Sequence, residues 1–298
     1  MTDIILLDGG MGQELVHRVG DRPTPLWSTQ VMVDHPGLVA QVHADYRAAG
    51  ATVQTTNTYA ILRDRLAGTG LEDRFEELYD VALKEAEGTG VIAGAIGPPG
   101  ASYRPDLMPA PATAVAIYRE IVGLLAPRVD LLIGETVASI AQAQAILKAA
   151  EDAPVPVWIA LTVQEDDGTR LRSGEAVADA LPHLDRAAAV LANCSSPEAI
   201  GTAIGVLAEG DKPFGGYANG FVRISDGFLR DKPTVDALAA REDLDPAAYA
   251  AFAMEWIAQG ATIVGGCCEV GPAHIAHLAQ TITASGHRIM APEDFKAA

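Results

Sequence analysis

The sequence contains few cysteines, few aromatic residues and few basic residues. Among 298 positions there are 3 cysteines and 5% aromatic residues, and 21 Lys and Arg stand against 39 Asp and Glu. The formal net charge of −18 argues against a nucleic-acid partner, because its phosphates would be repelled. No apolar run approaches the roughly 18 residues that a membrane-spanning helix needs. The odd number of cysteines, and the strain of pairing vicinal cysteines, argue against a disulfide framework.

Length and composition set the expected class of protein. A chain of 298 residues is long for one ordinary domain but normal for a single α/β barrel, and 49% hydrophobic residues can fill a large core. No basic segment precedes the apolar run at residues 4–7, so a signal peptide is not expected. We therefore expect a cytoplasmic protein with reduced cysteines, no membrane or nucleic-acid partner, and a homo-oligomer as a possible assembly.

Apolar runs rich in β-branched residues alternate with amphipathic segments along the whole chain. Strands are expected at 3–8, 51–56, 91–96, 130–135, 155–162, 188–193, 213–218 and 261–265, and helices at 36–49, 72–88, 112–126, 139–152, 196–208 and 246–259. This alternation indicates βαβ units and a parallel sheet. Eight units fit an α/β protein with the (β/α)8 TIM barrel fold, expected as one domain over residues 1–298. Residues 219–245 are the least regular and are expected to form a long loop over the active face.

A doubly wound sheet is the competing fold. The first expected strand ends in Asp8-Gly9-Gly10-Met11-Gly12, which resembles a nucleotide-binding loop. However, the segment lacks the GxGxxG spacing, and no Walker lysine follows it. We interpret these glycines instead as a loop whose bare backbone can approach a small ligand.

Mostly polar residues and all three cysteines stand at the expected carboxyl ends of the strands, where barrel enzymes carry their active sites. These positions are Asp8, Thr55, Thr56, Asn57, Gly97, Glu135, Thr162, Cys194, Asn219, Cys267 and Cys268. All three cysteines would thus face one cavity. Three soft ligands suit Zn²⁺ and leave a fourth position for water or a substrate sulfur. The alternative is that the cysteines are small buried hydrophobic residues. The pattern favours an enzyme that activates a thiol.

Motifs along the chain resemble those of the homocysteine S-methyltransferase family. They are Leu7-Asp8-Gly9-Gly10-Met11-Gly12-Gln13-Glu14-Leu15, Pro25-Leu26-Trp27-Ser28, His43-Ala44-Asp45-Tyr46, Ala49-Gly50-Ala51, Thr56-Asn57-Thr58-Tyr59, Gly97-Pro98, Glu135-Thr136, Asn193-Cys194 and Gly265-Gly266-Cys267-Cys268. The resemblance spans roughly residues 3–283. It implies a zinc-dependent barrel enzyme that transfers a methyl group from an onium donor to the thiol of L-homocysteine, forming methionine. Cys194, Cys267 and Cys268 would be its zinc ligands and catalytic centre.

The resemblance also implies roles for other residues. Asp8 and Glu135 would bind the homocysteine amino group, and the backbone around Gly9 and Gly10 its carboxylate, with Asn57 among the substrate-binding positions. For Asp8, a cap on the following helix is the alternative.

The methyl donor is the less determined substrate. Trp27 and Tyr59 match positions of an aromatic cage around a quaternary ammonium in the betaine-using members, although simple packing is the alternative for either. Thr136 occupies the place of a third cage aromatic. This departure favours the stand-alone type of enzyme that uses S-methylmethionine or S-adenosylmethionine over one that uses glycine betaine.

Two further histidines and two rival functions complete the expectations. His274 and His277 are spaced i, i+3 on the last expected helix and are interpreted as surface residues, not metal ligands. The first rival is a betaine-dependent methyltransferase, or one acting on another small thiol or selenol. The second is a non-catalytic zinc- or thiol-binding barrel, whose structural site would need a fourth protein ligand.

Overall fold

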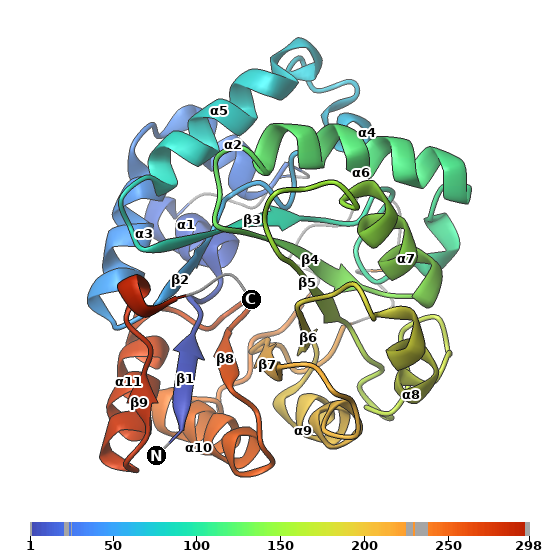
Figure 1. Ribbon diagram of the computed structural model, residues 1–298. Coiled ribbons are helices and arrows are strands. Elements are labelled where there is room, and N and C mark those ends of the chain that lie inside the picture. Colours follow the sequence, from blue (N-terminus) through green and yellow to red (C-terminus); the bar gives the residue numbers. More distant parts are fainter. Residues whose placement is uncertain (1, 21–23, 25, 225–228, 230–237, 296–298) are drawn as a thin grey trace.

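The structure, a computed structural model, describes residues 2–20, 24, 26–224, 229 and 238–295, and its strands form a parallel barrel (Figure 1). The sheet order is β2-β3-β4-β5-β6-β7-β8-β1-β9. The strands are β1 (Asp3–Leu6), β2 (Val53–Thr55), β3 (Val91–Ile96), β4 (Leu131–Val137), β5 (Val157–Leu161), β6 (Ala189–Asn193), β7 (Phe214–Ala218), β8 (Ile263–Gly266) and β9 (Arg288–Ile289). Each of the eight predicted strands is present.

The barrel closes between the ends of β1 and β2. Leu7 and Val53 form a parallel bridge there, the Asp8 amide donates to the Val53 carbonyl at 3.0 Å, and the Thr52 amide donates to the Leu6 carbonyl at 2.7 Å. The short strand β9 lies on the other side of β1, paired with it in parallel register. The predicted (β/α)8 barrel is therefore confirmed, and the doubly wound alternative is wrong.

Helices surround the barrel and follow the strands in the predicted alternation (Figure 1). They are α1 (Met11–Val19), α2 (Ser28–Asp34), α3 (Leu38–Ala48), α4 (Arg63–Leu66), α5 (Phe75–Ala86), α6 (Pro111–Leu125), α7 (Ile140–Ala149), α8 (Val177–Ala180), α9 (Pro197–Leu207), α10 (Pro246–Ala258) and α11 (Pro272–Ala284). Short 3₁₀ helices are η1 (Glu72–Arg74), η2 (Pro105–Leu107), η3 (Leu181–His183) and η5 (Pro292–Asp294). None of the described helices is long and apolar enough to cross a membrane.

Local sequence explains where several helices begin. The side chains of Ser139, Ser196 and Asp245 cap α7, α9 and α10 by accepting a backbone amide of the first turn. Proline stands at the start of α6, α9, α10 and α11, where a missing N–H costs nothing. Cys194 therefore lies in the short connection between the end of β6 and the capped start of α9.

Side chains, not solvent, fill the barrel interior. Small and branched residues from all eight barrel strands make this inner cluster, with Trp158 and Tyr217 as its large members. Phe295 packs against Trp158 with ring centroids 6.1 Å apart. Outside the strands, the Tyr249 hydroxyl of α10 donates to the Gly265 carbonyl at 2.5 Å and accepts from the Ala218 amide at 3.0 Å. Tyr249 thus connects β7 and β8 by hydrogen bonds close to the point where β8 leads into Cys267 and Cys268.

The predicted long loop at 219–245 lies partly outside the described residues, which omit 225–228 and 230–237. In its described parts, Phe221 forms an antiparallel bridge with Ala240. Phe221 and Leu238 also line the cavity at the carboxyl ends of the strands. The loop therefore contributes to the active face, as expected.

Candidate active site

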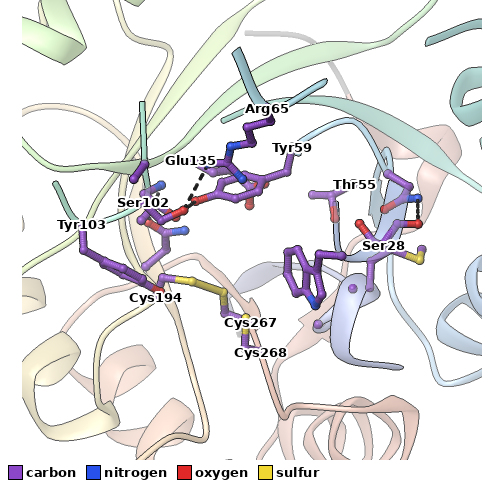
Figure 2. Close-up of a pocket in the computed structure, with 18 of the residues that line it drawn as sticks. Ser28, Thr55, Tyr59, Arg65, Ser102, Tyr103, Glu135, Cys194, Cys267 and Cys268 are labelled. Carbon is purple, nitrogen blue, oxygen red and sulfur yellow. Dashed lines mark hydrogen bonds between the residues drawn. A yellow bond between two sulfur atoms is a disulfide. The ribbon is translucent and has the colours of Figure 1, made fainter. Parts of the chain in front are cut away.

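A cavity of about 560 Å³ opens at the carboxyl ends of the strands (Figure 2). The predicted site residues all line it: Asp8, Gly9, Gly10, Trp27, Asn57, Tyr59, Glu135, Thr136, Cys194, Cys267 and Cys268. Three other predicted strand-end positions, Gly97, Thr162 and Asn219, are not among its lining residues. Residues from segments far apart in the sequence are thus brought to one place by the barrel topology.

The three cysteines converge from two strands. Cys194 follows β6 and Cys267 and Cys268 follow β8, and their sulfur atoms all lie within 4.8 Å of one another. No Cys, His, Asp or Glu of the described residues joins them as a fourth ligand in this group. Burial, and next the Glu269 carboxylate, raise the pKa of the Cys268 thiol to about 12, so a nearby cation is needed to hold it as a thiolate. This donor set fits a thiophilic metal with one open position.

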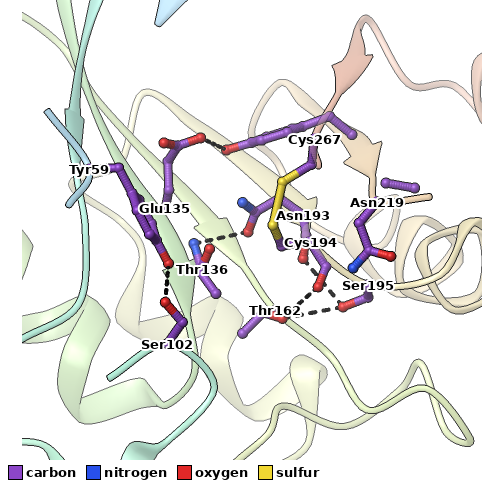
Figure 3. Close-up of a disulfide and its surroundings, with 12 residues drawn as sticks. Tyr59, Ser102, Glu135, Thr136, Thr162, Asn193, Cys194, Ser195, Asn219 and Cys267 are labelled. Atoms are coloured by element: carbon purple, nitrogen blue, oxygen red, sulfur yellow. Dashed lines mark hydrogen bonds between the residues drawn. A yellow bond between two sulfur atoms is a disulfide. The ribbon is translucent and has the colours of Figure 1, made fainter. Parts of the chain in front are cut away.

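Cys194 and Cys267 are joined by a disulfide, which corrects the expectation that none would form (Figure 3). Their Cα atoms are 5.8 Å apart, within the range that a disulfide spans. The expectation was wrong because the strain of a vicinal pair concerns Cys267 and Cys268, whereas the pairing joins residues 73 positions apart. Cys268 remains a free, buried thiol. Because disulfide sulfurs are not thiolates, a three-cysteine metal site requires this bond to be reduced first.

Asp8 is a buried carboxyl group at the end of β1. Its oxygens accept hydrogen bonds from the Thr55 amide and the Thr55 hydroxyl, both at 2.8 Å. Burial raises its pKa to about 8; the hydrogen bonds from Thr55 oppose this shift, and the charge of Glu135 adds to it. Helix α1 instead begins after Gly10 without a side-chain cap, so the helix-cap alternative for Asp8 is wrong. A buried carboxyl held this way is suited to pair with a cation.

Glu135 lies in β4 at an irregularity of the sheet. The pairing of β4 with β5 shifts register between Gly134 and Val137, and Thr136 adopts a left-handed backbone conformation with φ of 54°. Glu135 accepts a hydrogen bond from the Tyr217 hydroxyl at 2.8 Å. Burial raises its pKa to about 7, and the bond from Tyr217 opposes the shift. The bulge thus turns a second buried carboxyl group into the cavity, as bulges near active sites commonly do.

The glycines after β1 pack tightly against the cysteine loop. A side chain at Gly10 would place its Cβ 2.4 Å from the Cys267 carbonyl oxygen, and one at Gly9 would lie 2.1 Å from that of Val270. The Gly10 amide donates to Val270 at 3.0 Å. The glycines therefore allow close packing between the two loops; that their backbone binds a ligand stays a prediction. Gly10 has no amide to offer a ligand in this arrangement.

Aromatic side chains form the other wall of the cavity. Trp27 and Tyr59 meet edge to face with ring centroids 6.4 Å apart. The Tyr59 hydroxyl lies 2.7 Å from Ser102 Oγ. Asn57 donates to the Ser28 carbonyl at 3.3 Å, which anchors the helix that begins just after Trp27. Both aromatic rings face the cavity, so they are available to a ligand as well as to each other.

Backbone strain is concentrated at this cavity. Among the described residues, the non-glycine residues with positive φ are Trp27, Tyr103, Thr136, Cys194 and Glu269. The first four line the cavity, and the fifth directly follows the vicinal cysteines. Such conformations cost of order 1–3 kcal/mol each and cluster at functional sites. Their gathering here is independent support for assigning the functional site to this cavity.

Four residues that shape the site were assigned no role from the sequence. Tyr103 lines the cavity beside Cys194, and Tyr217 binds Glu135. Gln13 accepts a hydrogen bond from the Trp27 indole at 2.9 Å and donates to Glu269 at 2.5 Å. The remaining one, Asn193, accepts a hydrogen bond from the Thr136 amide at 3.0 Å and thereby holds the bulge beside Glu135 (Figure 3). The position of Gln13, a polar residue on the apolar face of α1, could have indicated a buried role from the sequence. Tyr103 lies in a loop without a periodic pattern, so no sequence pattern indicated its position.

The histidine interpretation needs one correction. His274 is half-buried in the first turn of α11, where its ring accepts from the Gly271 amide at 3.2 Å and contacts the Leu244 carbonyl at 3.1 Å. His277 is also half-buried. Neither is a fully exposed surface residue, because α11 packs against α10. Neither belongs to the cysteine cluster, so their exclusion as metal ligands agrees with the geometry.

Known proteins resemble the chain over nearly its whole length. The family model for homocysteine S-methyltransferase matches residues 5–282. The chain is 30% identical over 303 residues to a homocysteine S-methyltransferase of Escherichia coli (strain K12), covering 93% of this chain and 94% of that protein. It is 28% identical over 307 residues to the homocysteine S-methyltransferase YbgG of Bacillus subtilis (strain 168), covering 93% of each. The fold is similar to the metallated crystal form of the homocysteine methyltransferase MmuM from Escherichia coli, with a TM-score of 0.76, 28% identity, and coverage of 94% of this chain and 96% of that one.

Proposed function

Because the chain belongs to the homocysteine S-methyltransferase family, we propose that it uses Zn²⁺ to transfer a methyl group from a sulfonium donor to L-homocysteine. The products are methionine and the demethylated donor. S-methylmethionine and S-adenosylmethionine are the favoured donors. One observation carries the proposal: three convergent cysteine sulfurs share a cavity with the carboxyl groups of Asp8, which is buried, and Glu135, which is half-buried.

The cysteines of the reduced protein supply the metal site. Cys194, Cys267 and Cys268 would hold Zn²⁺ through three thiolates, with the fourth position left to the substrate sulfur. A metal ion held there would lower the pKa of the substrate thiol, so that its sulfur would be nucleophilic at neutral pH. Cys194 and Cys268 are buried, and all three cysteines line the cavity, so a substrate thiol entering the cavity could reach this position.

The two carboxyl groups orient the amino acid. An ammonium group entering the cavity pairs with Asp8 and Glu135, and both carboxyl groups give up their protons as it binds. Thr55 and Tyr217 hold the carboxylate oxygens in place through hydrogen bonds of 2.8 Å. These contacts fix the acceptor so that its thiol reaches the cysteine cluster.

The aromatic wall receives the donor. Trp27, Tyr59 and Tyr103 present rings to the cavity, and such rings attract an onium group through cation–π interaction. The sulfur of the acceptor attacks the donor methyl group, the methyl–sulfur bond of the donor breaks, and its electron pair stays on the departing thioether. The donor thereby loses its positive charge, which weakens its hold on the rings and promotes release.

The test is a donor-by-acceptor activity matrix on reduced, zinc-loaded protein. Donors are S-methylmethionine, S-adenosylmethionine and glycine betaine; acceptors are homocysteine, cysteine, selenocysteine and selenohomocysteine. We expect S-methylmethionine with homocysteine to give the highest kcat/KM. Robust turnover with betaine and none with either sulfonium would overturn the donor assignment. A higher kcat/KM with a selenol than with homocysteine would favour the alternative of a selenol methyltransferase. No turnover with any pair would favour the alternative of a non-catalytic binding protein.

A further inference from the structure

Arg65 is the only basic side chain among the described residues that line the cavity. We propose that its guanidinium binds the carboxylate of the methyl donor, so that the enzyme selects onium compounds that carry a carboxylate over simple cations. This inference rests on the proposed function and adds a specificity-determining contact to it.

The position of Arg65 places it against the donor wall. It lies in α4, and its Nη2 atom is 3.3 Å from the Pro98 carbonyl oxygen and 3.4 Å from Ser102 Oγ. Its guanidinium carbon is 5.5 Å from the centroid of the Tyr59 ring. Ser102 in turn bonds the Tyr59 hydroxyl, and Figure 2 shows the three side chains side by side at the cavity. The arginine is therefore held beside the aromatic ring proposed to receive the onium group.

The guanidinium has unused capacity for an anion. Within the described part of the chain, no carboxylate forms an ion pair with Arg65, and its two hydrogen bonds are long and go to neutral acceptors. The adjacent Asp64 carboxylate is occupied by the backbone amides of Arg65, at 3.0 Å, and Gly100, at 2.6 Å. A guanidinium carries five N–H donors and matches a carboxylate in a two-point contact. A half-buried arginine with so few partners is suited to receive the carboxylate of a ligand.

Arg63, on the same helix, differs from Arg65 because its guanidinium already has a carboxylate partner. It contacts Glu120 through a 2.7 Å bond and stacks over the Phe75 ring at 4.2 Å. It is exposed and does not line the cavity. Arg63 thus shares the helix and charge of Arg65 but lacks its access to the donor.

Charge explains why this contact would decide donor choice. A purely cationic donor would be repelled by the guanidinium beside Tyr59, because like charges at close range repel. A donor with its own carboxylate offsets that repulsion and anchors itself at the same time. Asp8 and Glu135 are proposed to bind the ammonium of the acceptor, so the carboxylate of the donor would be bound by a different residue of the cavity, Arg65.

The experiment compares Arg65→Gln, Arg65→Lys and the matched control Arg63→Gln as reduced, zinc-loaded proteins. With S-methylmethionine, Arg65→Gln should raise the donor KM about tenfold to a hundredfold, as loss of a charged hydrogen bond implies, while the homocysteine KM stays unchanged. Arg65→Lys should recover part of the loss, and Arg63→Gln should match the parent. A rise in the homocysteine KM instead, or no change in either KM, would overturn the proposal.

Trimethylsulfonium, a donor without a carboxylate, separates recognition from a structural effect. Arg65→Gln should leave its kcat/KM unchanged or raise it, because a repelling charge has been removed. Equal losses with trimethylsulfonium and S-methylmethionine would show a structural role and refute the contact. If the parent transfers no methyl group from any sulfonium, the proposed function fails. Calorimetric titration of S-methylmethionine into the parent and Arg65→Gln then decides the present inference, and equal affinities would overturn it.

Discussion

Acceptor binding should strengthen as pH rises, because the cavity must ionise its carboxyl groups to pair with an ammonium. Burial raises the pKa of Asp8 to about 8 and that of Glu135 to about 7. At pH 6 both groups are mainly protonated, and at pH 8 Glu135 is mainly ionised. An ammonium pairs with the ionised form, so its binding is linked to loss of protons.

The size of the effect follows from these pKa values. A carboxyl group with a pKa of about 7 is roughly one-tenth ionised at pH 6 and roughly nine-tenths ionised at pH 8, so Glu135 alone should strengthen binding about tenfold. Ionisation of Asp8 over the same range should steepen the dependence further. Methionine is the appropriate ligand for the assay, because it carries the amino and carboxylate groups of the acceptor without a titrating thiol.

The assay is calorimetric titration of methionine into reduced protein at pH 6, 7 and 8, in two buffers of different ionisation enthalpy to count released protons. Glu135→Gln should bind more weakly at pH 8 and lose much of the slope. Asp64→Asn is the matched control, since its carboxylate lines the cavity but is already bound to two backbone amides. A dissociation constant that stays within twofold from pH 6 to pH 8 would refute the reasoning.

Three further outcomes test other parts of the structure. Cys268→Ala should lower bound zinc, measured by elemental analysis of reduced protein, from about one per chain to a small fraction, and full metal content would refute the ligand assignment. Tyr249→Phe should lower the free energy of unfolding in urea by about 1–3 kcal/mol, because the hydrogen bond to the Gly265 carbonyl is lost and the Ala218 amide loses its buried partner. An unchanged free energy of unfolding would show that water replaces the hydroxyl. Gln13→Leu should raise the donor KM with little effect on homocysteine, because it releases the Trp27 indole, and a change confined to homocysteine would contradict that role.

The fold could be predicted because its signals are local. Strands buried on both sides read as apolar runs, and the serine, aspartate and proline residues that start helices stand at fixed offsets from them. Once the barrel was assigned, its topology alone brought residues at the strand ends together. This is why Asp8, Glu135 and the cysteines could be expected in one cavity.

The unpredicted features depend on tertiary contacts between distant segments. Tyr103 reaches the cavity through a left-handed backbone conformation in an irregular loop, which no periodicity indicates. Arg65 follows Arg63 and Asp64 in the sequence, and nothing in that run of charges shows which arginine lines the cavity. The packing of α4 decides this, because it places Arg63 over the Phe75 ring and Arg65 at the cavity. The disulfide joins the ends of β6 and β8, which are not neighbours in the sheet, so sequence spacing carried no sign of it.

The pairing of β1 has a consequence for how the chain is made. β1 is synthesised long before its main partners, β8 and β9. The Arg288 guanidinium donates to the Asp3 carboxylate at 2.7 Å, so β9 also bonds back to β1. During synthesis the nascent protein is therefore an open sheet with an unpaired apolar edge, a form prone to aggregate or to need a chaperone.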